Sequence, residues 1–350
     1  MKKPTTLRRG WTTGACATAA ARAAFRALKA GAAPASVTIA LPGGLTPTFS
    51  IAASGSTWAE VIKDAGDDPD ITHGARVRVE VTPGGAGVSF RAGDGVGTVT
   101  RPGLPLAIGE PAINPGPRRM IVENLSAENG GDAPNLIVTI AIADGVTLAA
   151  KTLNARLGIV GGLSVLGTSG VVIPYSCSAW VAAIQRGVDV ARASGLPHIA
   201  ACTGRTSEAA VRRRYGLEDA ALIEMGDFAG ALLGYLRRHP VPRLTLGGGF
   251  AKLVKLAMGA DDLHSARSRL DMARLADWLG ESGADAATVT TARDFTSAGQ
   301  VLELAQARAL PLGDLVAQRV RERVRAELSG NVEVEVWAFD RVGGEVGHAG

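Results

Sequence analysis

Apolar and polar positions alternate in short stretches along most of the first 150 residues, after one long helical segment. Thr12 or Thr13 can cap an alanine-rich helix over residues 15–30, which Gly31 ends. A period of two then predicts strands, each bounded by Gly, Pro or Asp, at residues 36–41, 46–52, 75–81, 87–92, 97–100 and 135–142. One helix followed by strands indicates an α+β domain.

The period changes from Leu163 onward, where strand-like and helical segments alternate. We expect strands at 163–167, 198–203, 221–225 and 243–247, and helices after them at 177–194, 207–216, 228–239 and 250–259. Further helices are expected at 264–280, 298–310 and 312–328, with an edge strand at 331–339. We therefore predict an α+β N-terminal domain, residues 1–152, and a Rossmann-like α/β domain with a mostly parallel sheet, residues 153–350.

Composition narrows the class of protein. Hydrophobic residues make up 46% of the chain and charged residues 20%, as in ordinary soluble globular proteins. The net charge of +4 comes without a dense basic stripe, which argues against nucleic-acid binding and favours a small anionic substrate. No apolar run is long enough to span a membrane. The three cysteines match no metal or disulfide spacing, and with no signal peptide they predict a cytoplasmic protein; homo-oligomerisation stays open.

Small and hydroxyl residues follow the ends of predicted strands, where ligands bind in open α/β sheets. GTSG at 167–170 follows the first strand of the second domain, and TGRT at 203–206 follows the next. Such residues either form tight turns or let backbone N–H groups approach a ligand, and their spacing is not G-x-G-x-x-G. Glu224 and Asp227, near the third strand end, could bind ribose hydroxyls, although a helix cap is slightly favoured for Asp227.

Four longer motifs resemble a known family. They are LRRGWTTGACATAAA at 7–21, DDPDITHGA at 67–75, GDGVGTVTRPGLPLAIGEPAINPGPR at 93–118 and ARLGIVGGLSVLGTSGVV at 155–172. In this order they are similar to the CbiD family of cobalamin biosynthesis, over residues 7–250 and more weakly to the end. Four long motifs in the expected order are far more specific than one glycine loop.

That resemblance implies methylation of C1 in cobalt-precorrin-5B, an anionic tetrapyrrole, with S-adenosyl-L-methionine as the methyl donor. It also implies an α+β half and a Rossmann-like half, in agreement with the pattern above. The donor is then expected at the strand ends of the second domain. The expected cofactor-binding residues are Gly161, Gly162, Gly167, Thr168, Ser169, Gly170, Thr203, Gly204, Glu224 and Asp227.

Arginines beside Gly- or Pro-rich loops are candidates for holding the carboxylates of such a substrate, because the planar guanidinium suits carboxylates. Thr13 and Gly14 join them, because the N–H groups at a helix N-terminus could face a carboxylate. Any single arginine could instead be a solvated surface residue. The expected substrate-binding residues are Arg8, Arg9, Thr13, Gly14, Arg101, Arg118, Arg119, Arg156 and Arg205.

The segment DDPDITH at 67–73 combines three aspartates with a histidine. Asp-Asp-Pro is good turn chemistry and the spacing matches no EF-hand or zinc pattern, so we favour a shaped loop. The methyl transfer that the resemblance implies needs no metal held by the protein. If the loop is functional, Asp70 or His73 would accept a proton from the macrocycle or approach the cobalt of the substrate.

Two other functions stay open. A protein that binds tetrapyrroles without catalysis would need only the arginines. A small-molecule kinase would use the glycine-rich turns for phosphates, but GGLSVLGTSG at 161–170 lacks the lysine of G-x-x-x-x-G-K-[ST].

Overall fold

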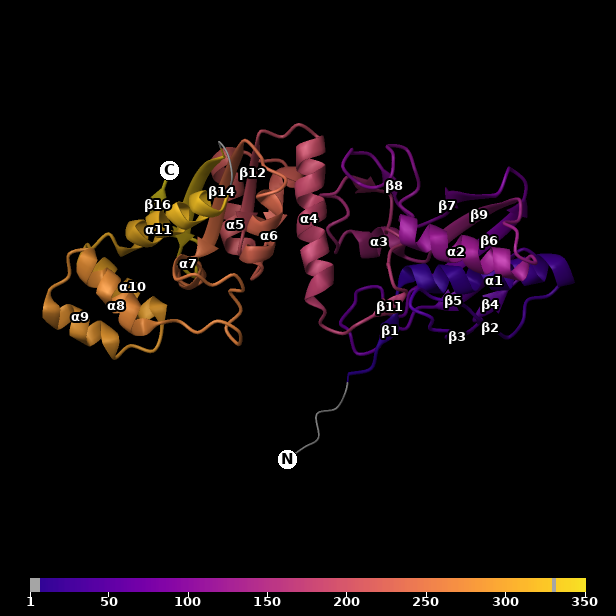
Figure 1. Cartoon of the computed structure of the whole chain (residues 1–350), viewed down its shortest axis with the longest axis horizontal. Coiled ribbons are helices and arrows are strands. Elements are labelled where there is room, and N and C mark those ends of the chain that lie inside the picture. Colours follow the sequence, from indigo (N-terminus) through magenta and orange to yellow (C-terminus); the bar gives the residue numbers. More distant parts are fainter. Residues whose placement is uncertain (1–6, 329–331) are drawn as a thin grey trace, which may run out of the picture. The chain divides into compact units, whose positions relative to one another are not determined.

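The computed structural model describes residues 7–328 and 332–350. The chain divides into two compact units, Met1–Cys177 (unit 1) and Ser178–Gly350 (unit 2) (Figure 1). Each unit has its own hydrophobic core. The division lies at 177/178 and not at the expected 152/153, so the glycine-rich segment 153–174 belongs to unit 1. No helix within the described ranges has the length and apolar character needed to cross a membrane.

Unit 1 contains three helices and eleven strands in its described part. In chain order they are β1 (Gly10–Trp11), α1 (Thr13–Ala30), β2 (Ser36–Thr38), β3 (Thr48–Ser50), β4 (Ala53–Ser54), β5 (Trp58–Ile62), β6 (Arg76–Pro83), β7 (Val88–Ala92), β8 (Thr98–Val99), α2 (Pro115–Glu128), β9 (Leu136–Ile142), α3 (Gly145–Ala149), β10 (Ile159–Val160) and β11 (Val171–Val172).

Helix α1 confirms the sequence prediction at both ends. Thr12 is the N-cap and its hydroxyl accepts from Ala15 N at 3.2 Å, while Gly31 ends the helix at a φ of +82°. The helix is buried along most of its length because its many alanines let it pack closely against β5, β6 and α2 (Figure 1). The main sheet of unit 1 beside it has the order β4-β5-β6-β9-β7, with only β7 and β9 parallel.

The segment after residue 153 corrects a prediction. Residues 163–167 were expected to form the first strand of a parallel sheet, but β10 pairs with β8 and β11 pairs with β1, both antiparallel and both within unit 1. Leu163 and Val165 form only isolated bridges, to Val96 and Ile113. The apolar run looked like a strand because it is buried, but its partners are short loops rather than a sheet.

Unit 2 alternates strands and helices over its first half, as predicted. Its elements are α4 (Cys177–Ala193, which starts at the last residue of unit 1), β12 (His198–Cys202), α5 (Arg205–Tyr215), η1 (Asp219–Ala221), β13 (Leu222–Glu224), α6 (Ala229–Leu236), β14 (Arg243–Gly249), α7 (Phe250–Ala257), α8 (Met272–Glu281), α9 (Ala286–Arg293), α10 (Ala298–Ala307), α11 (Leu312–Glu327), β15 (Glu333–Phe339) and β16 (Glu345–Ala349).

The sheet of unit 2 has the order β13-β12-β14-β15-β16. The first four strands are parallel and β16 pairs antiparallel with β15. The main core lies on the face that carries Ile199 and Leu246, whereas Ala200 and Phe339 face a smaller cluster beneath α5. Strand β15 is therefore interior, and our expectation of an edge strand there is wrong because β16, which we did not predict, covers it.

Candidate functional site

The glycine-rich segment packs against the N-terminal motif inside unit 1. Leu166 N donates to Thr13 Oγ1 at 3.0 Å, and the Leu166 carbonyl accepts from Gly14 N at 3.0 Å. Thr12 N donates to the carbonyl of Gly170, also at 3.0 Å. The start of α1 is thus occupied by protein atoms, and Thr13 and Gly14, expected to bind substrate, are buried there.

Gly167 explains why this segment is rich in glycine. Its φ is +122°, and a Cβ at this position would lie 2.3 Å from Thr12 Oγ1. A side chain would therefore separate two segments that must touch. Glycine serves close packing within unit 1 here.

The expected cofactor residues consequently fall into two groups. Six of them are not at the strand ends of the parallel sheet, as we expected, because their segment contributes no strand to it; these are Gly161, Gly162, Gly167, Thr168, Ser169 and Gly170. The other four lie in unit 2; these are Thr203, Gly204, Glu224 and Asp227. A cofactor role for the first group stays a prediction.

Asp70 is engaged by a buried lysine. Its Oδ2 lies 2.7 Å from Lys63 Nζ, and its Oδ1 accepts from both the N–H and the hydroxyl of Thr72. Burial opposes ionisation of this carboxyl, but the hydrogen bonds from Lys63 and Thr72 outweigh it, so the pKa of Asp70 is lowered. A carboxylate with a lowered pKa is a weak proton acceptor, and the arrangement favours a structural role.

His73 lies at the surface with one ring nitrogen occupied. Its Nδ1 accepts from Ala65 N at 3.1 Å. The neutral ring therefore carries its proton on Nε2, which makes the exposed nitrogen a donor. The proton-acceptor role predicted for His73 would need this bond to break.

The arginines of unit 1 that we expect to bind substrate differ in the groups they contact. Arg8 binds Asp64, and Arg118 binds Glu110 at 3.0 Å. The guanidinium of Arg8 and the N–H of Gly66 lower the pKa of Asp64 to about 2. Arg101 packs against Gly158 and Arg156 is half-buried, whereas Arg9 and Arg119 are exposed and pair with no carboxylate in the described ranges.

Unit 2 contains a cavity of about 540 Å³ at the carboxyl ends of β12, β14 and β15. Along the chain β12 leads to β13 on one side of the sheet and β14 leads to β15 on the other, so the strand order reverses between β12 and β14. Ligands bind at such switch points in open α/β sheets. Thr203, Gly204 and Arg205, all predicted from the sequence, line this cavity.

Two helices begin at the cavity with open N-termini. The N-cap of α5 is Gly204 and that of α7 is Gly249, so neither helix has a side-chain cap. A Cβ added at either glycine would meet no atom within 4 Å, so both backbones border open space. Free N–H groups at helix N-termini attract carboxylates and phosphates, and the exposed Arg205 and Arg341 add positive charge beside them.

Lys252, which our sequence analysis missed, connects three strand ends. Its Nζ donates to the Thr203 carbonyl at 3.0 Å and lies 3.1 Å from Asp227 Oδ1. Asp227 does not cap α6, whose N-cap is Phe228, and neither Asp227 nor Glu224 lines the cavity. The position of Lys252 just after the glycine cluster at 247–249 was the signal that could have identified it.

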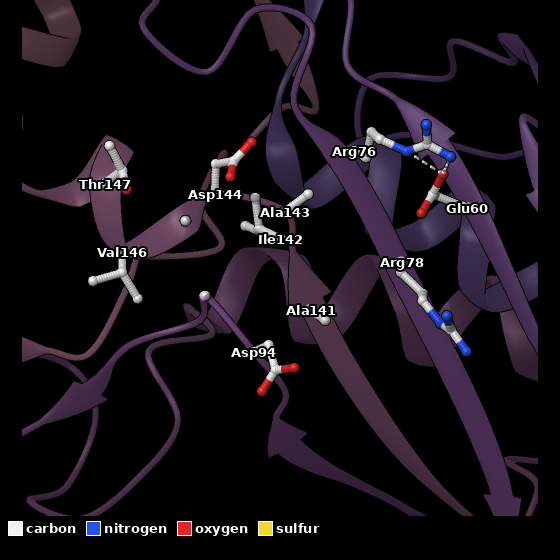
Figure 2. Close-up of a pocket in the computed structure, with 12 residues that line it drawn as sticks. Glu60, Arg76, Arg78, Asp94, Ala141, Ile142, Ala143, Asp144, Val146 and Thr147 are labelled. Carbon is white, nitrogen blue, oxygen red and sulfur yellow. Dashed lines mark hydrogen bonds and ion pairs between the residues drawn. The ribbon is translucent and has the colours of Figure 1, made fainter.

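A second cavity, of about 320 Å³, lies in unit 1 where β6 and β9 meet the loop before α3 (Figure 2). Arg76 Nε donates to Glu60 Oε1 at 2.7 Å, and the carboxylates of Asp94 and Asp144 point to different sides of the cavity (Figure 2). These charged groups are paired or divergent, so we assign the cavity no function. Within residues 7–328 and 332–350, no three His, Cys, Asp or Glu side chains are grouped to hold a metal.

Two parts of the chain match one protein family. Residues 1–174 match CbiD, and residues 262–350 match the C-terminal domain of CbiD. The family therefore accounts for more than half of the chain.

Relatives named cobalt-precorrin-5B C(1)-methyltransferase align along nearly the whole chain. The protein of Paramagnetospirillum magneticum is 54% identical, over 98% of this chain and 98% of its own. That of a Bradyrhizobium species is 55% identical, over 97% of this chain and 93% of its own. The crystal structure of a cobalamin biosynthesis protein (cbiD) from Archaeoglobus fulgidus is 29% identical and aligns over 75% of this chain and 83% of that one, with a TM-score of 0.42.

Proposed function

The chain belongs to the CbiD family, and from this premise we propose that it is a methyltransferase acting on C1 of cobalt-precorrin-5B in cobalamin biosynthesis. The observation that carries the proposal is the 54% identity over 98% of both chains to a relative with that name. The methyl donor is S-adenosyl-L-methionine and the product is cobalt-precorrin-6A.

The switch-point cavity of unit 2, part of a Rossmann-like domain, is the donor site that we propose. Its volume of about 540 Å³ suits a small molecule, since such sites span about 300–1,000 Å³. The open N–H groups that follow Gly204 and Gly249 would bind the methionine carboxylate. Glu303 on α10, which also lines the cavity, would accept a hydrogen bond from a ribose hydroxyl or the ammonium group.

The bound donor supplies a methyl group on a sulfonium, so its leaving group is already activated. The residues of the chain then have to hold donor and acceptor in line and to keep water away. Thr203 contributes by fixing two loops: its hydroxyl accepts from Gly249 N at 3.3 Å, and its carbonyl accepts from Lys252. We assign no base, because Asp70 and the Nδ1 atom of His73 are occupied by protein partners.

The variant Gly204→Val tests the donor site. The φ of Gly204 is 176°, which is extended backbone open to any residue, and a Cβ at this position meets no atom within 4 Å, so the new side chain would enter the cavity. We expect the fold to be kept and the affinity for S-adenosyl-L-methionine, measured by calorimetry, to fall about tenfold or more. Wild-type protein should convert cobalt-precorrin-5B to a product heavier by one methyl group, detected by mass spectrometry.

Gly234→Ala in α6 is the matched control, because a Cβ there also meets no atom within 4 Å and the residue does not line the cavity. It should bind the donor like wild type. If wild type methylates the substrate but Gly204→Val binds the donor with unchanged affinity, the proposed function stands and the donor site lies elsewhere. Substrate binding without methylation would identify a tetrapyrrole-binding protein, and ATP binding in place of the donor would favour a kinase.

A further inference from the structure

Three large apolar side chains are exposed along one short segment of unit 1. Leu166 is 51% exposed, Ile173 is 53% exposed and Tyr175 is 67% exposed. Single exposed apolar residues are ordinary, but neighbouring ones point to a binding surface, and Ile173 and Tyr175 are only two residues apart. The segment is anchored along its length to residues 10–14 by the β1–β11 pair and the bonds of Leu166 and Gly170, so its backbone is fixed.

Tyr175 occupies a backbone position that favours glycine. Ser176 N donates to the Ile173 carbonyl at 3.2 Å and closes a turn with Pro174 second and Tyr175 third, where the φ of Tyr175 is +56°. A left-handed third position suits glycine or asparagine. The tyrosine ring is exposed, so packing within unit 1 does not explain why a tyrosine stands there.

Asp68 holds Tyr175 in this conformation. Its Oδ1 accepts from Tyr175 N at 2.8 Å. The same loop is tied to the start of the chain, because Asp67 Oδ2 accepts from Arg8 N at 2.6 Å. The aspartate-rich loop therefore fixes the backbone at Arg8 and at Tyr175, and it holds the exposed ring of Tyr175 in a defined position.

Arg9 provides a positive charge at the same end of the β1–β11 ladder. Gly10 pairs with Val172, so Arg9 and Ile173 are the next residues of the two strands beyond this pair. Arg9 is exposed and has no carboxylate partner within the described ranges, unlike Arg8, which binds Asp64. An anion could therefore bind Arg9 without displacing a protein group.

We propose that Arg9, Ile173 and Tyr175 form the surface of unit 1 that receives the tetrapyrrole, with the apolar side chains against the macrocycle and Arg9 on a carboxylate arm. The inference rests on the proposed function for the identity of the ligand. A flat apolar ring with anionic arms matches a small apolar surface with a free guanidinium at its edge. Asp68 is a positioning residue that acts through Tyr175.

The variants Tyr175→Gly and Arg9→Gln test this surface. Glycine relieves the left-handed strain, so Tyr175→Gly should be at least as stable as wild type in urea unfolding. Both variants should raise the KM and the dissociation constant for cobalt-precorrin-5B about tenfold, the latter measured by absorbance titration. Their affinity for S-adenosyl-L-methionine should equal that of wild type.

Val146→Ser and Arg91→Gln are matched controls, because Val146 is 61% exposed on α3, Arg91 is exposed on β7, and both lie outside residues 9–14 and 166–175. Both should keep the wild-type KM. Wild-type KM and substrate affinity in Tyr175→Gly and Arg9→Gln would overturn the proposal. A second result would also overturn it: an unchanged KM in Tyr175→Gly, together with a wild-type dimer in sedimentation that this variant dissociates. The surface would then join two copies of the chain. If the wild-type protein binds cobalt-precorrin-5B without methylating it, the proposed function is wrong. The comparison of substrate affinities between wild type and the variants still tests the proposed surface.

Discussion

The ammonium group of Lys63 is buried in unit 1, where the whole residue is 2% exposed and Asp70 is its ion-pair partner. A buried charge is costly without a partner, which accounts for an aspartate at this position. The sequence places Asp70 in an aspartate-rich loop that resembles a catalytic one, but it does not reveal that the side chain of Lys63, seven residues earlier, is buried next to it. Residue type alone could therefore not separate the structural role from the catalytic one.

Replacing Asp70 by asparagine distinguishes these roles. Asp70→Asn leaves the buried ammonium of Lys63 without a counter-charge, so the free energy of unfolding in urea should fall by about 3–5 kcal/mol. The double variant with Lys63→Met should recover much of that loss. A single variant as stable as wild type that nevertheless fails to methylate would restore Asp70 to the catalytic residues.

The candidate site was predictable where its residues follow a clear strand. Thr203, Gly204 and Arg205 come directly after β12, whose buried apolar run and flanking loops are legible in the sequence. Arg341 was not predictable, because it reaches the cavity from the turn between β15 and the unpredicted β16.

At the scale of elements, several long periodic segments were predicted well, but the 14-residue helix α2 and most of the short strands were not. Helices α1, α4 and α11 lie within a few residues of their predicted bounds. Strands β1, β4 and β10 have only two residues each, too few to show a period. The helix expected at 264–280 begins only at Met272, where Asp271 caps it, and the expected strand residue 331 lies outside the described ranges.

A polar network crosses the sheet of unit 2 and ties β16 to it. Glu335 on β15 accepts from Arg243 Nη2 at 2.9 Å and lies 2.9 Å from His348 Nε2 on β16. Burial would raise the pKa of Glu335, but hydrogen bonds from Tyr215, Arg243 and His348 outweigh it and lower the pKa to about 2. The ionised form is therefore the one that the folded sheet stabilises.

The pH dependence of stability should reveal this network. Because the folded pKa of Glu335 lies below its ordinary 4.5, its stabilisation is complete above that pH and is lost as the pH falls toward 2. Glu335→Gln should lower the free energy of unfolding at pH 7 by about 1–3 kcal/mol and flatten this part of the profile. Glu333→Gln, on the same strand with a largely exposed carboxylate, should change little. Equal profiles for wild type and Glu335→Gln would contradict this account.

The whole chain consists of two units with separate cores, and the donor site that we propose lies in only one of them. Independent cores predict independent unfolding. The late boundary at 177/178 was not predictable, because the segment 153–174 has the apolar character of a new domain but finds its partners in the earlier one.

Calorimetric unfolding of the full chain should show two transitions. S-adenosyl-L-methionine at a hundred times its dissociation constant should stabilise unit 2 by about 2.7 kcal/mol and leave the transition of unit 1 in place. At the same donor concentration Gly204→Val should lose about half of that stabilisation or more, in keeping with its tenfold or greater loss of affinity. If S-adenosyl-L-methionine raises the unfolding temperature of unit 1 only, the donor site lies in unit 1, as we first expected for the glycine-rich segment.

The pairing of β1 with β11 also bears on how the protein is made. These strands join residues 10–11 to residues 171–172, so β1 cannot pair until β11, the last strand of unit 1, has been synthesised. During synthesis the alanine-rich helix α1 leaves the ribosome long before most of the strands that will cover it. Such distant contacts slow folding and leave apolar surface open in the meantime, so we expect the nascent unit to depend on chaperones until residue 172 emerges.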